Sequence, residues 1–197
     1  MAVRRHTAQG IERKHQLLDC AASLFSSRGY AATRIADICA DAGVAKGLFY
    51  WYFENKEALF AELIASMRKR LRKAQADAMD PAADPLTRLR QGTEASVRFM
   101  AEHAGYFALL EVESHDRGVS DLLNKGADIH TEDSARIVKE AIAEGLIPEG
   151  RDPQLLALGL IGSVAHFGHL HRVGRVTLTI DELATFVGDW VVDALGG

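Results

Sequence analysis

Residues 38–56 read ICADAGVAKGLFYWYFENK, and this stretch decides the fold. Its first residues complete a short helix that is predicted to begin at Thr33, a good N-cap residue, and to end at Gly43. The apolar side chains that this helix turns inward are Ile35, Ile38 and Cys39. A second short helix is predicted at Ala45–Phe53. Two short helices joined by a tight glycine turn are typical of a helix-turn-helix unit.

The residues on both sides of this unit also have helical spacing. The preceding helix is predicted to stop at Gly29, which is suited to a left-handed cap. Its apolar face consists of Leu17, Leu18, Ala21, Ala22, Leu24 and Phe25. The following helix is longer, over Lys56–Ala78, and its apolar positions are Leu59, Phe60, Leu63, Ile64, Met67 and Leu71. We therefore expect three short helices to lead into one long helix.

The clearest break in the chain is the segment DPAADP at 80–85, because proline disfavours helix in the residue before it. Beyond it the sequence predicts five more helices, at 85–103, 105–116, 119–145, 153–172 and 180–195. Residues 175–180 are strand-like but short and isolated, so a loop is predicted there. The expected fold is all-α with about nine helices. A helix-turn-helix domain at 1–55 is followed by a helical ligand-binding and dimerisation domain at 56–197.

Composition is that of an ordinary globular protein. The 197 residues are 48% hydrophobic and 25% charged, which excludes a disordered or collagen-like chain. Two cysteines are too few for a disulfide framework, and residues 1–15 lack the apolar run of a secretory leader. We therefore expect a cytoplasmic protein with reduced thiols. Residues 153–171 are uncharged, but three histidines and other polar groups favour a buried helix over a membrane span, so no membrane partner is expected.

The net charge at first argues against a nucleic-acid partner. It is -4, whereas a polyanion is normally met by a basic face. The charges are unevenly distributed, however. Residues 1–73 hold 13 Lys and Arg against 7 Asp and Glu, a net of +6, and residues 74–197 hold 10 against 20, a net of -10. The acidic total is an average over two different halves, and it does not exclude DNA.

The sequence from about residue 11 to residue 63 resembles the N-terminal DNA-binding domain of the TetR family of bacterial transcriptional regulators. The matching positions are Ala21, Leu24, Phe25, Gly29, Thr33, Ile38, Ala42, Gly43, Val44, Gly47, Tyr50, Phe53, Lys56 and Glu57. Beyond residue 63, the helical plan and the chain length resemble the family. The resemblance implies a homodimeric regulator that binds double-stranded DNA.

The second short helix carries the groups that a DNA contact needs. A cation and a glycine are followed by the aromatic residues Tyr50, Trp51 and Tyr52, on a helix short enough to enter a major groove. The resemblance implies phosphate contacts from Tyr50, Tyr52, Lys56 and Thr33. It implies that the side chains facing the bases are Lys46, Leu48 and Trp51. The expected DNA-binding set is completed by Arg34, Ala45 and Gly47.

Packing is the alternative role for several of these positions. The expected core of the small domain consists of Leu17, Leu24, Phe25, Ile35, Ile38, Val44 and Phe49. Phe53 is also expected to pack rather than to bind. Without the family pattern, Tyr50 and Tyr52 would be interpreted as ordinary packing residues. Ala45 stands where the family commonly has Ser or Thr, so the second short helix is expected to lack a side-chain N-cap.

A second site is expected in the helix predicted at 119–145. Its apolar stripe places two polar residues, His130 and Ser134, on a face that should be buried. Such groups could orient a small apolar effector, and a hydrogen-bonded core histidine is the alternative. The expected pocket residues are Met67, Phe99, Met100, Phe107, His130, Ser134 and His166. His166 and His169 share a helical face, but no cysteine lies nearby and no metal is expected.

The last two predicted helices are unusually apolar. Apolar residues cover almost the whole circumference of the first, so the pair needs a partner surface. The resemblance implies that two copies pack these helices into a four-helix bundle, and a twofold dimer suits a palindromic operator. The expected interface residues are Leu156, Leu160, Ser163, Phe167, Phe186, Val187, Trp190 and Val191.

These features predict a ligand-responsive repressor that leaves a palindromic operator when a small apolar effector binds. One alternative is an activator, or a regulator released by redox chemistry at Cys20 or Cys39, although both are expected to be buried structural thiols. Another is an all-α enzyme or ligand carrier with a vestigial helix-turn-helix. The sequence has no nucleophile–base pairing, phosphate-binding glycine loop or specific metal spacing, so no enzyme and no cofactor are expected.

Overall fold

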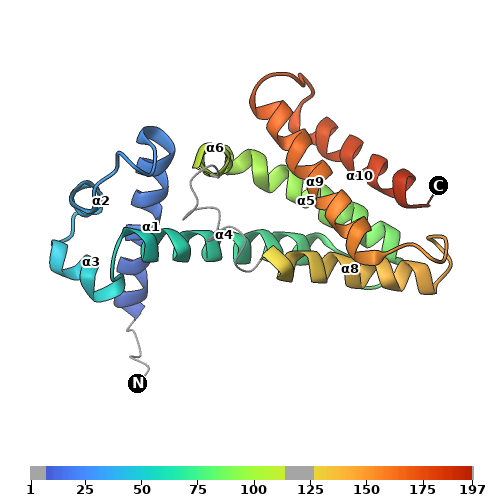
Figure 1. Cartoon of the computed structure of the whole chain (residues 1–197), viewed down its shortest axis with the longest axis horizontal. Coiled ribbons are helices and arrows are strands. Elements are labelled where there is room, and N and C mark those ends of the chain that lie inside the picture. Colours follow the sequence, from blue (N-terminus) through green and yellow to red (C-terminus); the bar gives the residue numbers. More distant parts are fainter. Residues whose placement is uncertain (1–7, 114–126, 197) are drawn as a thin grey trace. The chain divides into compact units, whose positions relative to one another are not determined.

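The computed structural model describes residues 8–113 and 127–196, which form helices and connecting loops without a strand (Figure 1). The helices are α1 (Ala8–Arg28), α2 (Ile35–Asp41), α3 (Lys46–Tyr52), α4 (Lys56–Ala78), α5 (Pro85–Glu102), α6 (Ala104–Glu113), α8 (Ala127–Ala143), α9 (Pro153–Arg172) and α10 (Ile180–Gly196). The all-α prediction is confirmed for these residues. The first part of the helix expected at 119–145 lies outside the described residues.

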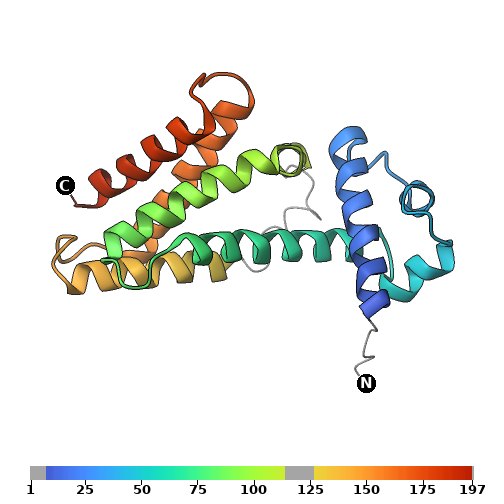
Figure 2. The same ribbon diagram turned by 180° about the vertical axis from the view of Figure 1, so that it is seen from behind.

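The helices form two compact units. Unit 1 contains α1, α2, α3, the part of α4 up to Met67, and α6 from Gly105 onward. Unit 2 contains the rest of α4 together with α5, α8, α9 and α10, and Figure 2 shows the same elements from behind. The boundary between the units thus falls inside α4. The functional boundary expected at residues 55 and 56 stays a prediction.

Unit 1 is built around aromatic side chains from α1 and α4. Phe25 and Phe60 are fully buried and meet edge to face, with ring centroids 5.6 Å apart. Tyr30 packs against Phe60 at 4.8 Å. α1 ends as predicted at Gly29, which has a φ of 85° and donates its N–H to Phe25 O at 2.8 Å. This core holds α1 against the first part of α4.

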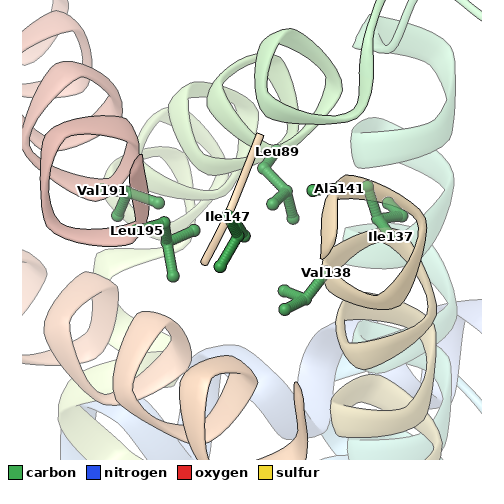
Figure 3. Close-up of a cluster of buried hydrophobic side chains, with 7 residues drawn as sticks. All are labelled: Leu89, Ile137, Val138, Ala141, Ile147, Val191 and Leu195. Carbon is green, nitrogen blue, oxygen red and sulfur yellow. The ribbon is translucent and has the colours of Figure 1, made fainter. Parts of the chain in front are cut away.

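The core of unit 2 is a cluster of seven buried side chains from α5, α8, α10 and the loop after α8 (Figure 3). They are Leu89, Ile137, Val138, Ala141, Ile147, Val191 and Leu195. Figure 3 shows Ile147 between the side chains of α8 and those of α10. α5 packs closely on α10 at Gly188, where a Cβ atom would lie 3.0 Å from Glu94 Cγ and 3.1 Å from Arg90 Cγ. A glycine therefore lets α5 and α10 approach closely at this crossing.

The prediction that Thr33 is the N-cap of α2 is wrong. The N-cap residue is Arg34, whose backbone N–H donates to Asp37 Oδ2 at 3.0 Å. The Thr33 hydroxyl instead donates backwards, to Gly29 O at 2.8 Å, and its side chain is buried. Thr33 thus closes the loop after α1, and Asp37 supplies the carboxylate that stabilises the start of α2.

The prediction that the uncharged helix at 153–171 is buried is also wrong within one protomer. α9 buries Ala157 and Val164, whereas Leu155 and Leu158 on other faces are 68% and 55% exposed. Leu156 and Leu160 pack against the core cluster of unit 2. In the part of the chain that the structure describes, no helix has the length and apolar character needed to cross a membrane. α9 therefore has one face on the core and one apolar face in solvent.

Candidate nucleic-acid interface

A tight turn at Gly43 joins α2 to α3. Gly43 has a φ of 63°, a left-handed conformation that side chains with a Cβ rarely adopt. Backbone hydrogen bonds close the turn, from Gly43 N to Ala40 O at 3.2 Å and from Val44 N to Cys39 O at 2.9 Å. The turn fixes the direction in which α3 leaves α2, as a helix-turn-helix requires.

Two buried phenylalanines determine which face of α3 is turned towards the protein and which towards solvent. Phe49 is fully buried and Phe53, one turn later, is 4% exposed, with ring centroids 5.5 Å apart. The packing predictions for both residues are confirmed. Because Phe49 and Phe53 hold one face of α3 against the rest of unit 1, the opposite face lies in solvent. This exposed face consists of Lys46, Gly47, Tyr50 and Trp51.

The exposed face of α3 combines a cation with large aromatic surfaces. Tyr50 is 50% exposed and Trp51 is 44% exposed. Lys46 Nζ lies 6.0 Å from the centroid of the Tyr50 ring, and Trp51 stacks edge to face on Tyr52 at 4.6 Å. Tyr52 and Leu48 are half-buried. The residues expected to face bases therefore differ in reach, because Lys46 and Trp51 project further into solvent than Leu48.

Two other backbone features of α3 bear on a close approach to DNA. Ala45 is the N-cap residue of α3 and makes no side-chain capping bond, as predicted. At Gly47, a Cβ atom would find no other atom within 4 Å. The folding of this protomer therefore does not require a glycine at position 47. A glycine there leaves room for another molecule to approach the backbone of α3 closely.

Lys56 links two parts of unit 1 through its ammonium group. Its ammonium group donates to Tyr30 O at 2.7 Å and to Thr33 O at 3.0 Å, and it lies 4.2 Å from the centroid of the Tyr30 ring. These bonds tie the start of α4 to the loop between α1 and α2. In the protomer, the side chains of Lys56 and Thr33 donate to backbone carbonyls at Gly29–Thr33, and the phosphate contacts expected of both residues stay a prediction. Arg34, beside them, is exposed.

Replacing Lys56 tests whether its hydrogen bonds to the loop stabilise the fold. We expect Lys56→Met to lower the free energy of unfolding by about 1–3 kcal/mol, because the loop carbonyls lose a charged donor. Lys46→Met is the matched control, since Lys46 is exposed, and its effect on stability should stay within about 0.5 kcal/mol. Urea denaturation of both variants measures the difference. Wild-type stability of Lys56→Met together with weakened DNA binding would show instead that Lys56 contacts phosphate.

Two residues that sequence reasoning missed also hold this surface. Asn55 Oδ1 accepts the Ala58 N–H at 2.7 Å and so caps α4. Lys14 of α1 pairs with Glu62 of α4 at 2.8 Å, and its ammonium group lies 5.7 Å from the Phe53 ring centroid. The cap could have been found, because an asparagine directly before a helix start is a typical N-cap. The Lys14–Glu62 pair joins residues far apart in the sequence and gave no local pattern.

Cys39 in α2 is buried as expected, whereas Cys20 in α1 is only half-buried. Burial raises the pKa of Cys20 to about 11, and the hydrogen bond of its thiol to the Asp41 carboxylate adds to this increase. Burial also raises the pKa of Cys39, although Lys46 partly opposes this effect. Both groups therefore remain thiols near neutral pH, in agreement with a structural role.

This protonation state predicts slow thiol chemistry in the native protein. At pH 7.5, Ellman's reagent should modify native Cys20 and Cys39 at least about tenfold more slowly than the cysteines of denatured protein, because the thiolate is the nucleophile. The DNA affinity of a Cys20→Ala, Cys39→Ala double variant should not respond to peroxide, and neither should that of the wild type. Rapid native modification accompanied by loss of DNA binding would favour the redox alternative.

The residues expected to line an effector pocket are divided between the two units. Met67 and Phe107 belong to unit 1, and the other five belong to unit 2. Phe99 and Met100 are buried, Ser134 is half-buried, and His166 is exposed on α9. Burial lowers the pKa of His130, and the nearby guanidinium groups of Arg72 and Arg68 act in the same direction, against Asp133. His130 is therefore neutral at pH 7.

The structure divides the expected interface residues into two classes. Val187 and Val191 are buried in the core of their own protomer, so they cannot face a partner. Phe186 and Trp190 are 47% and 40% exposed, and both rings pack edge to face against the half-buried Phe167. Leu155 and Leu158 on α9 are exposed as well, so both α9 and α10 present apolar side chains to solvent. Ser163 donates its hydroxyl to Gly159 O at 2.7 Å, within α9.

Known proteins resemble this chain in both sequence and fold. Residues 17–63 match the family model described as "Bacterial regulatory proteins, tetR family". The chain is 29% identical over 163 residues to the uncharacterized HTH-type transcriptional regulator YdgC of Bacillus subtilis, which covers 81% of this chain and 80% of that protein. It is 32% identical over 110 residues to the HTH-type transcriptional repressor KstR2 of Mycobacterium tuberculosis, over 56% of this chain and 55% of that protein.

A solved structure extends the likeness to the complete fold. The transcriptional regulator FadR from Bacillus subtilis, in complex with stearoyl-CoA, superposes with a TM-score of 0.81. The alignment covers 92% of this chain and 98% of that chain, with 21% sequence identity. At this identity the likeness shows the fold alone. The matched family model, in contrast, covers α2 and α3 completely, together with the second half of α1 and the start of α4.

Proposed function

This chain belongs to the TetR family of bacterial transcriptional regulators, and we propose that it is a repressor that binds a palindromic operator as a homodimer and leaves it when a small molecule binds. It is a DNA-binding regulator and not an enzyme. The observation that carries the DNA part of the proposal is the solvent-exposed face of α3, with Lys46, Gly47, Tyr50 and Trp51. Relatives in this family include the repressor KstR2.

α3 suits the major groove in size and in chemistry. Its seven residues form two turns, about 10 Å long, and the B-DNA major groove is about 12 Å wide. Lys46 and Trp51 lie where they can meet base edges and thymine methyl groups, while the Tyr50 hydroxyl can reach a phosphate. Thr33 and Lys56 act through the backbone of the loop that they hold. The DNA-binding role of Lys56 is therefore positioning.

Tyr50 and Trp51 should respond differently to substitution. Tyr50→Phe removes a single hydroxyl, and we expect it to weaken specific and random DNA alike, by about threefold to tenfold. Trp51→Ala should lower the ratio of specific to non-specific affinity, because a lost base contact costs about 1–3 kcal/mol on the specific site. Titrations on both DNAs measure the two effects. Equal loss of both affinities in Trp51→Ala would remove Trp51 from base readout.

The dimer part of the proposal rests on the exposed apolar side chains of α9 and α10. Leu155, Leu158, Phe186 and Trp190 are between 40% and 68% exposed in one protomer. Large apolar side chains with this exposure are stabilised when a second surface covers them. A twofold axis through α9 and α10 lets the same residues face each other, and it also pairs two copies of α3. We therefore propose a second copy of this chain as the partner.

The effector part of the proposal rests on the regulatory helices and on a structural neighbour. FadR of Bacillus subtilis was solved with stearoyl-CoA, a small molecule bound by that protein. We propose that an effector in unit 2 of this chain favours a geometry in which the two copies of α3 no longer match successive major grooves. A regulator acts where its DNA lies, so we propose a cytoplasmic location.

A titration of the purified protein against DNA tests the proposal. The upstream region of its own gene and a scrambled DNA of equal length are compared at physiological salt, because phosphate contacts make affinity salt-dependent. We expect at least about a thousandfold preference for the specific DNA, as for other specific regulators. Equal affinity for the upstream region and the scrambled DNA would contradict regulation at that site.

A further inference from the structure

Lys14 of α1 lies where α1, the end of α3 and the start of α4 meet. These elements all belong to unit 1, and in both views the end of α3 lies beside the N-terminal part of α1 (Figures 1 and 2). The Lys14 ammonium group pairs with Glu62 Oε1 at 2.8 Å and lies 5.7 Å from the centroid of the Phe53 ring. One side chain of α1 therefore contacts both the residue that ends α3 and a residue of α4.

The Lys14 side chain lies on the packed side of α1. Leu17 and Leu18, three and four positions later, are buried, and residues with this spacing share a helix face. The Lys14 side chain itself is 25% exposed, so its methylene stem is largely covered. A DNA phosphate would have to compete with Glu62 and the Phe53 ring for this ammonium group. The environment of Lys14 thus favours a role within the protein.

Phe53 determines where α3 ends. It is the C-cap residue, with an extended backbone at φ −132° and ψ 131°, and its N–H donates to Phe49 O at 2.9 Å. Its ring is buried, and an ammonium group above an aromatic ring is attracted to the negative face of that ring. Lys14 therefore holds the Phe53 ring from the side of α1, and with it the last turn of α3.

Aromatic contacts continue from Phe53 to the exposed face of α3. The Tyr52 ring lies 6.3 Å from the Phe53 ring, and Trp51 meets Tyr52 edge to face at 4.6 Å. Trp51 is the exposed end of this series. A displacement of Phe53 therefore changes the support of Tyr52, on which Trp51 packs. Base contacts depend on such placement, because the donors, acceptors and methyl groups of the groove have fixed positions.

The contact between Lys14 and Glu62 contributes little to folding. The Glu62 side chain is 47% exposed, and water screens ion pairs of this kind. Loss of the Lys14 charge is therefore expected to change the melting temperature only slightly. Its effect on DNA recognition can be measured apart from its effect on stability.

We propose that Lys14 is a positioning residue for DNA recognition, which holds Phe53 and so fixes the end of α3 from which Trp51 reads bases. It acts on sequence specificity without touching DNA. The step through Trp51 rests on the base contact described under the proposed function.

Titrations of Lys14→Met on the specific DNA and on a scrambled DNA of equal length test this role. Methionine keeps an apolar stem and removes the charge. We expect the ratio of specific to non-specific affinity to fall by about threefold to tenfold, the value of a lost cation–ring contact. The slope of log affinity against log salt concentration should not change, because a positioning residue neutralises no phosphate.

Two further variants serve as controls. Lys14→Arg should keep the wild-type ratio, because a guanidinium group can also pair with Glu62 and lie over the Phe53 ring. Arg28→Met makes the same change of charge at an exposed position in the last turn of α1, and it should keep the ratio as well. Thermal unfolding verifies that each variant is folded at the temperature of the titrations. Lys14→Gln replaces Lys14→Met if the latter does not fold.

A double variant tests the route through Trp51. In a Trp51→Ala background, Lys14→Met should not lower the ratio further, because the side chain that Lys14 positions is missing. Additive losses would overturn the proposal, and so would an unchanged ratio in Lys14→Met alone. Equal loss of both affinities, with a salt slope reduced by about one, would show that Lys14 contacts phosphate and would also overturn it.

The same titrations separate this proposal from the proposed function. A wild type that prefers no DNA contradicts specific regulation itself. A wild type with a clear preference and a Lys14→Met variant with the same preference contradict only the role of Lys14. If Trp51→Ala keeps the ratio and Lys14→Met lowers it, the base contact of Trp51 is wrong and the positioning of α3 by Lys14 is supported.

Discussion

A variant that carries Leu158→Glu and Trp190→Glu is expected to be a monomer and to bind operator DNA at least about a hundredfold more weakly than the wild type. Both wild-type side chains are exposed in one protomer, by 55% and 40%. In the proposed dimer, each new carboxylate would lie in an apolar interface without a partner, at a cost of about 3 kcal/mol or more. This cost corresponds to about a hundredfold in affinity. A monomer also loses the second half-site.

Light scattering and a DNA titration measure the two consequences together. The wild type should have twice the chain mass of 21.5 kDa, and the double variant should have the mass of one chain. Leu178→Glu is the matched control, because Leu178 is also apolar and 40% exposed but lies in the loop between α9 and α10. This control should remain a dimer. A double variant that stays dimeric would place the interface on other helices.

Gly47→Leu should leave the protein folded and lower specific DNA affinity by about a hundredfold. A Cβ atom at position 47 meets nothing within 4 Å in the protomer, so the larger side chain has room. In helices, glycine is also about 1 kcal/mol less favourable than alanine, so the variants should not lose helix stability. In the complex, the leucine would separate α3 from the groove and break several contacts at once. The loss should therefore exceed that of a single contact.

Gly47→Ala provides a graded control. Its single methyl group should weaken DNA binding less than leucine does, with a melting temperature equal to that of the wild type or higher. Thermal unfolding and DNA titration of both variants separate packing from binding. A lower melting temperature with normal DNA affinity would mean that Gly47 serves the fold, in contradiction to the proposed interface.

The helices could be predicted from the sequence because their patterns are local. The apolar spacing within α4 and the glycine after α1 each depend on residues within a few turns of one another. Phe49 and Phe53 were also assigned correctly to the packed side of α3. A helix-turn-helix is almost entirely specified in this local way.

The roles of Thr33 and Lys56 could not be predicted in the same way. A threonine before a helix is a typical N-cap. Here, however, the Thr33 hydroxyl donates to Gly29 O, and the N-cap residue is Arg34. Lys56 donates to the carbonyl of Tyr30, which is 26 residues earlier in the chain. Only the folded loop shows that these carbonyls converge on one ammonium group.

The apolar terminal helices show a further limit of sequence patterns. Leu158 and Val187 are equally apolar in the sequence, yet Leu158 is 55% exposed and Val187 is fully buried. Which apolar face of α10 meets α5 depends on the close crossing at Gly188, a packing detail between distant elements.

Selection of bound sequences from a random DNA pool tests whether a dimer reads DNA through α3, since it needs no assumption about the regulated gene. We expect enrichment of an inverted repeat whose half-sites are about one helical turn, or a multiple of it, apart. Trp51→Ala should relax the preference within each half-site while the symmetry remains. Enrichment of an unrepeated sequence, or of none at physiological salt, would contradict a dimer that reads DNA through α3.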